Sequence, residues 1–183
     1  ALAFLTRIPM PRSWLRFDIT LLGKIHFYVP LIGLIVGVIN SVLYYTFILI
    51  FSHSISVVLT LAAGIFITVA YHEDGFADVC DGLGGGDTVE KKLAIMKDSR
   101  LGTYGVLGLV MLLLTKFATL NEVSPVDILR ILIAAHVLSR WSMLPLILSL
   151  KYIGKTNETI EFFNGMSLVK LILISLMAMT GLY

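Results

Sequence analysis

The chain has 183 residues, of which 57% are hydrophobic and 14% charged, and its formal net charge is +2. Soluble domains carry about 25% charged residues, so this composition excludes an ordinary soluble protein and favours one that spans a membrane. The small net charge gives no support for nucleic-acid binding. The single cysteine, Cys80, excludes an intramolecular disulfide bond.

The length predicts one domain, a single membrane domain over residues 1–183. The chain begins at Ala1 without a methionine and ends within an apolar stretch at Tyr183, so we expect the natural protein to be longer. Residues 1–8 are largely apolar, and Pro9 and Pro11 then interrupt any helix. This first segment is expected to lie on the membrane surface.

Five apolar segments follow, and their length and continuity predict transmembrane helices rather than barrel strands. The predicted fold class is therefore all-α, a polytopic transmembrane helix bundle. The first helix carries Gly33, Gly37 and Ser41 at four-residue spacing, which is typical of a face that packs closely against another helix. The five segments lie near residues 27–51, 55–71, 103–120, 128–150 and 168–183.

The distribution of basic residues predicts the orientation in the membrane. Two connections, residues 52–54 and 121–127, carry no Lys or Arg, and the intervening loops are basic. We therefore expect a multi-pass protein of the cell membrane, with its N-terminus and the loop after residue 71 in the cytoplasm. The basic residues on that side are Arg7, Arg12, Arg16, Lys24, Lys91, Lys92, Lys97, Arg100, Lys151 and Lys155.

A cluster of acidic residues directly follows the second apolar segment, where residues 72–82 hold four of the 12 carboxylates in the chain. If the helix continues through this segment, Asp74, Asp78 and Asp81 fall within an arc of about 60° on one face, and Glu73 lies further round. Such a face is repulsive without a cation, and hard oxygen ligands favour Mg²⁺, Mn²⁺ or Ca²⁺. We predict a metal site here, with Glu73 as a further candidate ligand; the alternative is a solvated acidic helix end.

The loop that follows has features of its own. The glycine-rich run Gly82-Leu83-Gly84-Gly85-Gly86 is predicted to stop the helix, and residues 87–90 resemble a capping box that begins a short amphipathic helix at the interface. Gly75 has no side chain and would let a phosphate approach the backbone closely. Beyond the short helix, Lys97 and Arg100 can hold a diphosphate, and Asp98 can act as a metal ligand or a base.

Two basic residues lie inside predicted membrane helices. Arg140 is near the middle of the 128–150 segment, where insertion costs about 2.5–3.5 kcal/mol. We expect it to meet a phosphate or a carboxylate, with His136 one turn earlier on the same face; a purely structural arginine pair is the alternative. Lys116 is nearer the outer side and is expected to snorkel towards it.

The acidic block Glu73-Asp74-Gly75-Phe76-Ala77-Asp78-Val79-Cys80-Asp81-Gly82 and the later block Ile95-Met96-Lys97-Asp98-Ser99-Arg100-Leu101-Gly102-Thr103-Tyr104-Gly105 resemble one family. The family is cobalamin synthase, also called adenosylcobinamide-GDP ribazoletransferase. The family commonly has His-Leu-Asp-Gly where this chain has His72-Glu73-Asp74-Gly75. Residues 4–9, 29–33 and 138–141 match the family too.

The resemblance implies a Mg²⁺-dependent membrane enzyme that acts late in cobalamin biosynthesis. It would transfer the phosphate-bearing cobinamide of adenosylcobinamide-GDP to α-ribazole or its 5′-phosphate and release GMP. Its partners would be these small molecules and the lipid bilayer, with no nucleic acid; a homo-oligomer is left open. In this interpretation Mg²⁺ is bound by Asp74, Asp78 and Asp81. The proton of the attacking hydroxyl passes to Asp98 or Asp81. The substrate phosphates are bound by Lys97, Arg100, Arg7 and Arg140.

Two other functions are weighed against this one. A CDP-alcohol phosphotransferase also uses an Asp-rich membrane helix, but its pattern has Ala-Arg soon after the first Asp-Gly, and here Ala77 is followed by Asp78. A divalent-cation transporter would need acidic residues near the bilayer midplane. In this chain they are expected at a cytoplasmic helix end, with Arg140 at the midplane.

Overall fold

The computed structural model describes residues 2–11, 26, 28–150 and 166–180. Within this part of the chain all regular structure is helical, so the all-α fold class is confirmed. The basic residues Arg12, Arg16, Lys24, Lys151 and Lys155, which support the predicted orientation, lie outside the described residues. The helices are α1 (Leu2–Leu5), α2 (Val29–Ile48), α3 (His53–Ile67), α4 (Tyr71–Gly85), α5 (Val89–Ile95), α6 (Thr103–Asn121), α7 (Ile128–Trp141), α8 (Met143–Ser149) and α10 (Leu168–Thr180).

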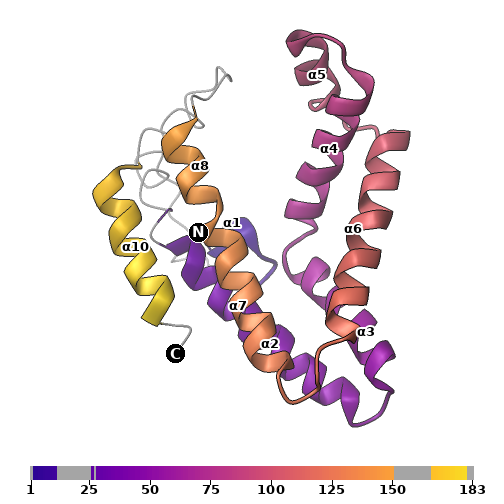
Figure 1. The fold of residues 1–183 in the computed structure, drawn as a ribbon, viewed down its shortest axis with the longest axis vertical. Helices are drawn as coiled ribbons and strands as arrows, with labels where there is room; N and C mark the ends of the chain where they lie inside the picture. The colour runs from indigo at the N-terminus through magenta and orange to yellow at the C-terminus, as the bar shows by residue number, and fades with distance from the viewer. Residues whose placement is uncertain (1, 12–25, 27, 151–165, 181–183) are drawn as a thin grey trace.

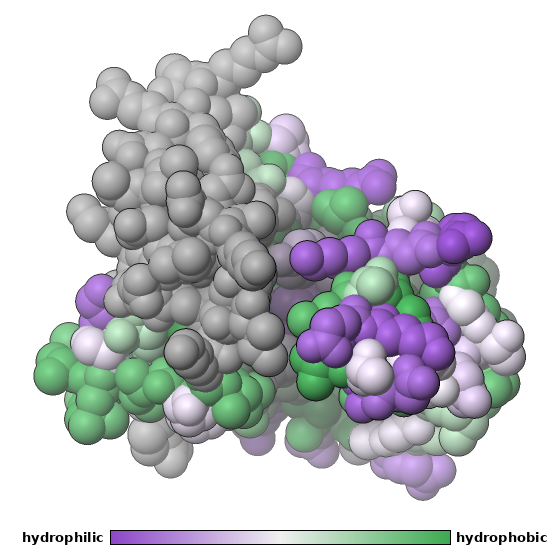
Figure 2. Space-filling view, turned by 90° about the horizontal axis from the view of Figure 1, so that it is seen from above, coloured by the Kyte–Doolittle hydropathy of each residue, from purple (hydrophilic) through white to green (hydrophobic). Residues whose placement is uncertain are grey.

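Two helix pairs organise the molecule (Figure 1). The more extensive contact is between α2 and α7, and the next is between α4 and α6, with α3 touching both α2 and α6. α5 packs against α4 at the upper end of the molecule in this view. Seen from that end, the part of the surface near α5 is rich in hydrophilic side chains (Figure 2).

The close packing of α2 and α7 depends on the small residues predicted for this purpose. A Cβ atom added to Gly33 would collide with the carbonyl oxygen of His136, and one added to Gly37 would lie 2.8 Å from the Cα of Ile133. Ser41 is fully buried and donates to the carbonyl of Gly37 at 2.8 Å. The structure therefore confirms the packing face.

Within the described residues, three helical stretches are long and apolar enough to cross a membrane: α2, α6 and the combined α7–α8 stretch from Ile128 to Ser149. α6 leaves most of its apolar surface unburied, as at Val110 and Met111, which are 48% and 62% exposed. Apolar surface on this scale is expected to contact lipid. The described part of the chain is therefore that of a membrane protein.

The second predicted membrane segment is not one straight helix. α3 ends at Ile67, and α4 begins at Tyr71 after a bend of 89°. Val69 and Ala70 at the break have φ angles of 58° and 54°, in the left-handed region that costs an L-residue about 1–2 kcal/mol. The expectation that one helix continues through Asp81 is therefore wrong, and the acidic residues lie on a separate helix packed beside α6.

Candidate functional site

The acidic helix α4 is positioned by the break that precedes it. The backbone N–H of Arg7 donates to the carbonyl of Ile67 at 2.8 Å, so the N-terminal stretch is attached at the end of α3. The Arg7 side chain is exposed. Asp74, Asp78 and Asp81 do lie one turn apart along α4, as their spacing predicted, and Asp78 is within electrostatic reach of the other two.

Asp81 holds the start of α6. Its side chain is buried, and both carboxylate oxygens accept backbone hydrogen bonds of 2.8 Å, from the N–H groups of Gly102 and Gly105. These N–H groups belong to the first turn of a helix, where they have no partner within the helix and favour negative charge. A Cβ atom on either glycine would collide with the Asp81 carboxylate. The structure thus gives Asp81 an anchoring contact, with neither oxygen left without a donor.

Glu73 lies on another side of α4 and is paired with a residue that the sequence had placed elsewhere. The Lys116 ammonium donates to Glu73 Oε1 at 2.9 Å. Lys116 therefore does not snorkel, and that prediction is wrong. Two signals were available: a lone lysine in an apolar helix is costly without a partner, and Glu73 is the one acid of the cluster outside the Asp arc.

Asp74 and Asp78 differ from their two acidic neighbours. Among the described residues, neither side chain makes a hydrogen bond or an ion pair, and Asp74 is exposed. The space beside Gly75, the next residue, is open, since an added Cβ would meet no heavy atom within 4 Å. By contrast, a Cβ on Gly82 would lie 2.6 Å from Met96 Cγ, so that glycine allows α4 and α5 to pack.

The residues predicted to hold a diphosphate lie after α5 and are partly committed to one another. Arg100 Nε donates to both carboxylate oxygens of Asp98 at 3.0 Å, and the backbone N–H of Arg100 donates to Oδ1 at 3.1 Å. These hydrogen bonds hold the pKa of Asp98 below its ordinary value. Lys97 is exposed and makes no ion pair within the described part of the chain. Asp98 is therefore held by Arg100, and the structure does not group it with the carboxylates of α4 as a metal ligand.

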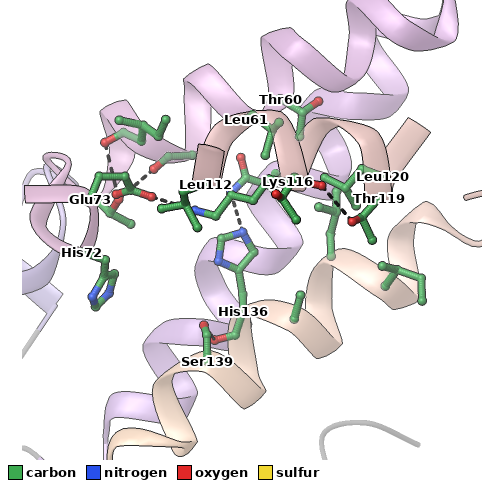
Figure 3. A pocket seen from close by; sticks show the side chains of 18 of the residues that line it. Thr60, Leu61, His72, Glu73, Leu112, Lys116, Thr119, Leu120, His136 and Ser139 are labelled. Atoms are coloured by element: carbon green, nitrogen blue, oxygen red, sulfur yellow. Dashed lines mark hydrogen bonds and ion pairs between the residues drawn. The ribbon is translucent and has the colours of Figure 1, made fainter. Parts of the chain in front are cut away.

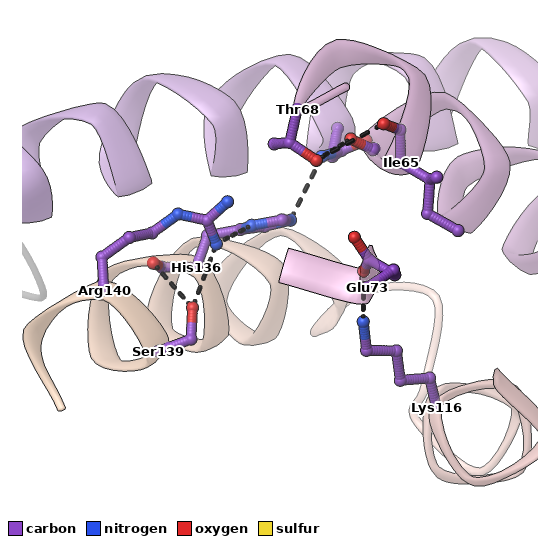
Figure 4. A network of polar contacts seen from close by, with 9 residues as sticks. Ile65, Thr68, Glu73, Lys116, His136, Ser139 and Arg140 are labelled. Atoms are coloured by element: carbon purple, nitrogen blue, oxygen red, sulfur yellow. Dashed lines mark hydrogen bonds and ion pairs between the residues drawn. The ribbon is translucent and has the colours of Figure 1, made fainter. Parts of the chain in front are cut away.

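Arg140 is buried, with 6% of its surface exposed, and its described partners are neutral. Nη1 lies 2.9 Å from His136 Nδ1 and donates to Ser139 Oγ at 3.0 Å. Figure 4 shows Arg140, His136 and Ser139 together. The other ring nitrogen, His136 Nε2, lies 3.1 Å from the side-chain amide of Asn40. The expected carboxylate partner is not found among these contacts, although Glu73 is close enough to be felt electrostatically.

The predicted site residues thus fall into three groups. Asp74, Asp78 and Gly75 share an open part of α4, the segment from Lys97 to Arg100 follows α5, and Arg140 and Glu73 (Figure 3) line a cavity of about 540 Å³. Asp81 and Arg7 stand apart from these groups, Asp81 against the start of α6 and Arg7 at the end of α3. Among the described residues, no group of three or more His, Cys, Asp or Glu side chains is arranged to hold a metal ion. Asp74 and Asp78 fit Mg²⁺ as a two-carboxylate site, because this ion usually takes one or two carboxylates and completes its shell with phosphate and water.

Comparison with known proteins gives a consistent family. The model of the family described as "Cobalamin-5-phosphate synthase" matches residues 1–183. A protein named adenosylcobinamide-GDP ribazoletransferase from Shewanella frigidimarina is 46% identical over 156 residues, which cover 84% of this chain and 59% of that protein. The protein of the same name from Vibrio parahaemolyticus is 40% identical over 160 residues, covering 87% of this chain and 60% of its own length. The chain therefore spans about three fifths of these relatives. No solved structure matches the chain.

Proposed function

Because the chain belongs to the cobalamin-5-phosphate synthase family, we propose that it transfers the cobinamide phosphate of adenosylcobinamide-GDP to α-ribazole or α-ribazole 5′-phosphate. One observation carries this proposal: α6 neutralises Glu73 and Asp81, whereas Asp74 and Asp78 have no described partner. Two uncompensated carboxylates one helical turn apart form a site for a hard divalent cation. The family match favours this reaction over lipid phosphotransfer or cation transport.

In the proposed reaction a hydroxyl oxygen of ribazole forms a bond to the phosphorus atom attached to cobinamide. The bond between that phosphorus and the bridging oxygen breaks, GMP leaves with the bridging oxygen, and the hydroxyl proton passes to a base. Mg²⁺, when bound, neutralises charge on the bridging and non-bridging oxygens. Asp74 and Asp78 would hold the ion, and the bare backbone at Gly75 leaves room for the diphosphate beside them.

The segment after α5 supplies the positive charge in this proposal. Lys97 has no described ion pair, and the Asp98–Arg100 pair is exposed, so solvent screening makes it weak and easily exchanged. Arg100 can therefore turn from Asp98 to a substrate phosphate. That exchange would leave Asp98 as an exposed carboxylate able to accept the hydroxyl proton. Arg7, whose exposed side chain lies beside the end of α3, is a further candidate to bind a substrate phosphate.

The placement in the cell is part of the same proposal. We place the protein in the cell membrane as a multi-pass domain, with the N-terminus and the α4–α5 region on the cytoplasmic side and α5 at the interface. Alternation of basic and non-basic loops supports this orientation. A cytoplasmic active site would also give the soluble, phosphorylated substrates direct access.

A GMP-release assay tests the function. The full chain in liposomes is given adenosylcobinamide-GDP and α-ribazole 5′-phosphate, with and without Mg²⁺. We expect Mg²⁺-dependent GMP release, and we expect Asp74→Asn and Asp78→Asn each to lower turnover about 100-fold or more.

The matched control is Asp87→Asn, which removes an exposed carboxylate that forms an ion pair with Lys91 at 3.3 Å and accepts from the backbone N–H of Thr88, and it should retain wild-type turnover. No GMP release from wild type would overturn the enzyme assignment. Wild-type turnover in Asp74→Asn or Asp78→Asn would overturn the metal site alone.

A further inference from the structure

The acidic helix α4 is attached to α6 near both of its ends, and the two proposed metal ligands lie between the attachments. At the start of α4, Glu73 Oε1 accepts from the Lys116 ammonium at 2.9 Å. Near its end, Asp81 accepts from two backbone N–H groups at the first turn of α6. Asp74 directly follows the first attachment, and Asp78 lies one turn further along. The position of both carboxylates therefore depends on how α4 is held against α6.

Glu73 depends on Lys116 for its place at the first attachment. Among the described side chains, Lys116 alone donates to the Glu73 carboxylate, and Oε2 is buried without a hydrogen-bond partner (Figure 4). Only 13% of the Glu73 side chain is exposed, so water would compensate little for a lost ammonium group. A largely buried carboxylate is costly to keep in place without its cation. Loss of the Lys116 ammonium is therefore expected to move Glu73.

Two features of the structure set the direction of that movement. Arg140, on α7, lines the same cavity as Glu73, is within electrostatic reach of it, and has no carboxylate partner in the described contacts. The turn before α4 is strained, because Val69 and Ala70 have left-handed φ angles of 58° and 54°. Release of Glu73 from α6 would let the first turn of α4 rotate towards Arg140 as the break relaxes. That turn carries Asp74, which would move with it.

We propose that Lys116 is a positioning residue for the metal-binding carboxylates. Its contact with Glu73 fixes the rotation of the first turn of α4 and so keeps Asp74 at a spacing from Asp78 that one cation can bridge. Lys116 contacts neither the cation nor the diphosphate and acts through Glu73 alone. The proposal rests on the metal site of the function proposed above and adds a residue on a separate helix to it.

Binding of Mn²⁺ alone, measured by electron paramagnetic resonance on protein in detergent, tests this role without turnover. Wild type should bind a Mn²⁺ ion that Mg²⁺ displaces and that Asp78→Asn does not bind. Lys116→Met should raise the Kd for this ion about 10-fold or more, as loss of a residue that orients metal ligands usually does. Removal of a positive charge would by itself tighten cation binding. A Kd that is unchanged or lower in Lys116→Met would therefore overturn the proposal.

Two further variants separate positioning from stability. The double variant Glu73→Leu/Lys116→Met replaces the pair with apolar side chains of similar size, an exchange that proteins often tolerate well. It should bind Mn²⁺ within about threefold of wild type, and a Kd as high as that of Lys116→Met would show that Lys116 does not act through Glu73. If Lys116→Met does not fold, Lys116→Gln, which keeps a donor on a shorter side chain, should raise the Kd at least about threefold, and an unchanged Kd would overturn the proposal.

The matched control is Lys91→Met, which removes a lysine from the exposed ion pair with Asp87 on α5 and should leave the Kd for Mn²⁺ unchanged. In the GMP-release assay, Lys116→Met should raise the Mg²⁺ concentration for half-maximal rate about 10-fold and leave the rate at saturating Mg²⁺ within about threefold.

The possible failures are distinguishable. The predicted Mn²⁺ affinities without GMP release from wild type would refute the function and leave the role of Lys116 standing. Mn²⁺ binding that Asp78→Asn does not weaken would refute the metal site and this proposal with it. GMP release from wild type, with the same Mn²⁺ and Mg²⁺ dependence in Lys116→Met, would refute the positioning role alone.

Discussion

The contact of Asp81 with the first turn of α6 makes a prediction that separates an anchoring role from a metal-binding one. In Asp81→Asn, one oxygen remains to accept from Gly102 or Gly105, and the amide nitrogen faces the other backbone donor at the same 2.8 Å spacing. One hydrogen bond to a charged group contributes about 1.5–3 kcal/mol, and the lost charge at the helix N-terminus adds about 0.3–1 kcal/mol. We therefore expect Asp81→Asn to lower the free energy of unfolding by about 2–4 kcal/mol.

The assay is unfolding in mixed SDS–detergent micelles, followed by tryptophan fluorescence, with and without Mg²⁺. Asp78→Asn is the matched control, one turn away on α4 and without a described hydrogen bond, and should change stability by no more than about 0.5 kcal/mol. Mg²⁺ should still stabilise Asp81→Asn, because binding to the native state alone raises stability, and it should no longer stabilise Asp78→Asn. If Asp81→Asn unfolds like wild type and loses the response to Mg²⁺, Asp81 is a metal ligand and our reasoning is wrong.

Three further predictions concern two glycines and the Asp98–Arg100 pair. Gly75→Ala should stabilise α4 by up to about 1 kcal/mol, because alanine favours a helix and the added methyl group meets no atom, and it should nevertheless lower the rate of GMP release. Gly33→Ala forces α2 away from α7 and should lower the free energy of unfolding by about 1–3 kcal/mol in the same assay. A stabilised Gly75→Ala with full activity would contradict close approach of the diphosphate. Arg100→Gln should raise the pKa of Asp98 towards its ordinary value of about 3.9, measured by carboxyl NMR titration. Because the pKa of Asp98 is lower in the folded than in the unfolded state, the pair stabilises the fold above about pH 3.9, and this stabilisation is lost as the pH falls through the lowered pKa. If the pKa of Asp98 is the same in Arg100→Gln as in wild type, Arg100 is not the cause of the lowered pKa.

The sequence predicted those features that depend on local pattern. Hydrophobic length identified helical membrane segments, and four-residue spacing identified the glycine face on which α2 meets α7. The spacing of Asp74, Asp78 and Asp81 also predicted their one-turn separation on α4. Each of these features follows from the helical repeat, which is a property of neighbouring residues in one segment.

The remaining features depend on contacts between distant segments, which periodicity does not encode. Glu73 and Lys116 are 43 residues apart and meet only because α4 packs alongside α6. The break at Val69 and Ala70 was missed because neither residue favours a left-handed backbone, so no glycine or asparagine marked it. That break turns α4 by 89° relative to α3 and brings its carboxylates beside α6.

The bend also explains why only two of the four carboxylates remain for a cation. Without the 89° bend after α3, α4 would not run in the direction in which it packs beside α6. After the bend, α4 turns Glu73 and Asp81 towards α6, where a lysine and a helix N-terminus meet them, while Asp74 and Asp78 lie to one side of that contact. Strained backbone of this kind persists where surrounding contacts hold it and is concentrated at functional sites. Arg7, whose N–H bonds to Ile67, supplies one such contact and links the N-terminal stretch to the geometry of the proposed site.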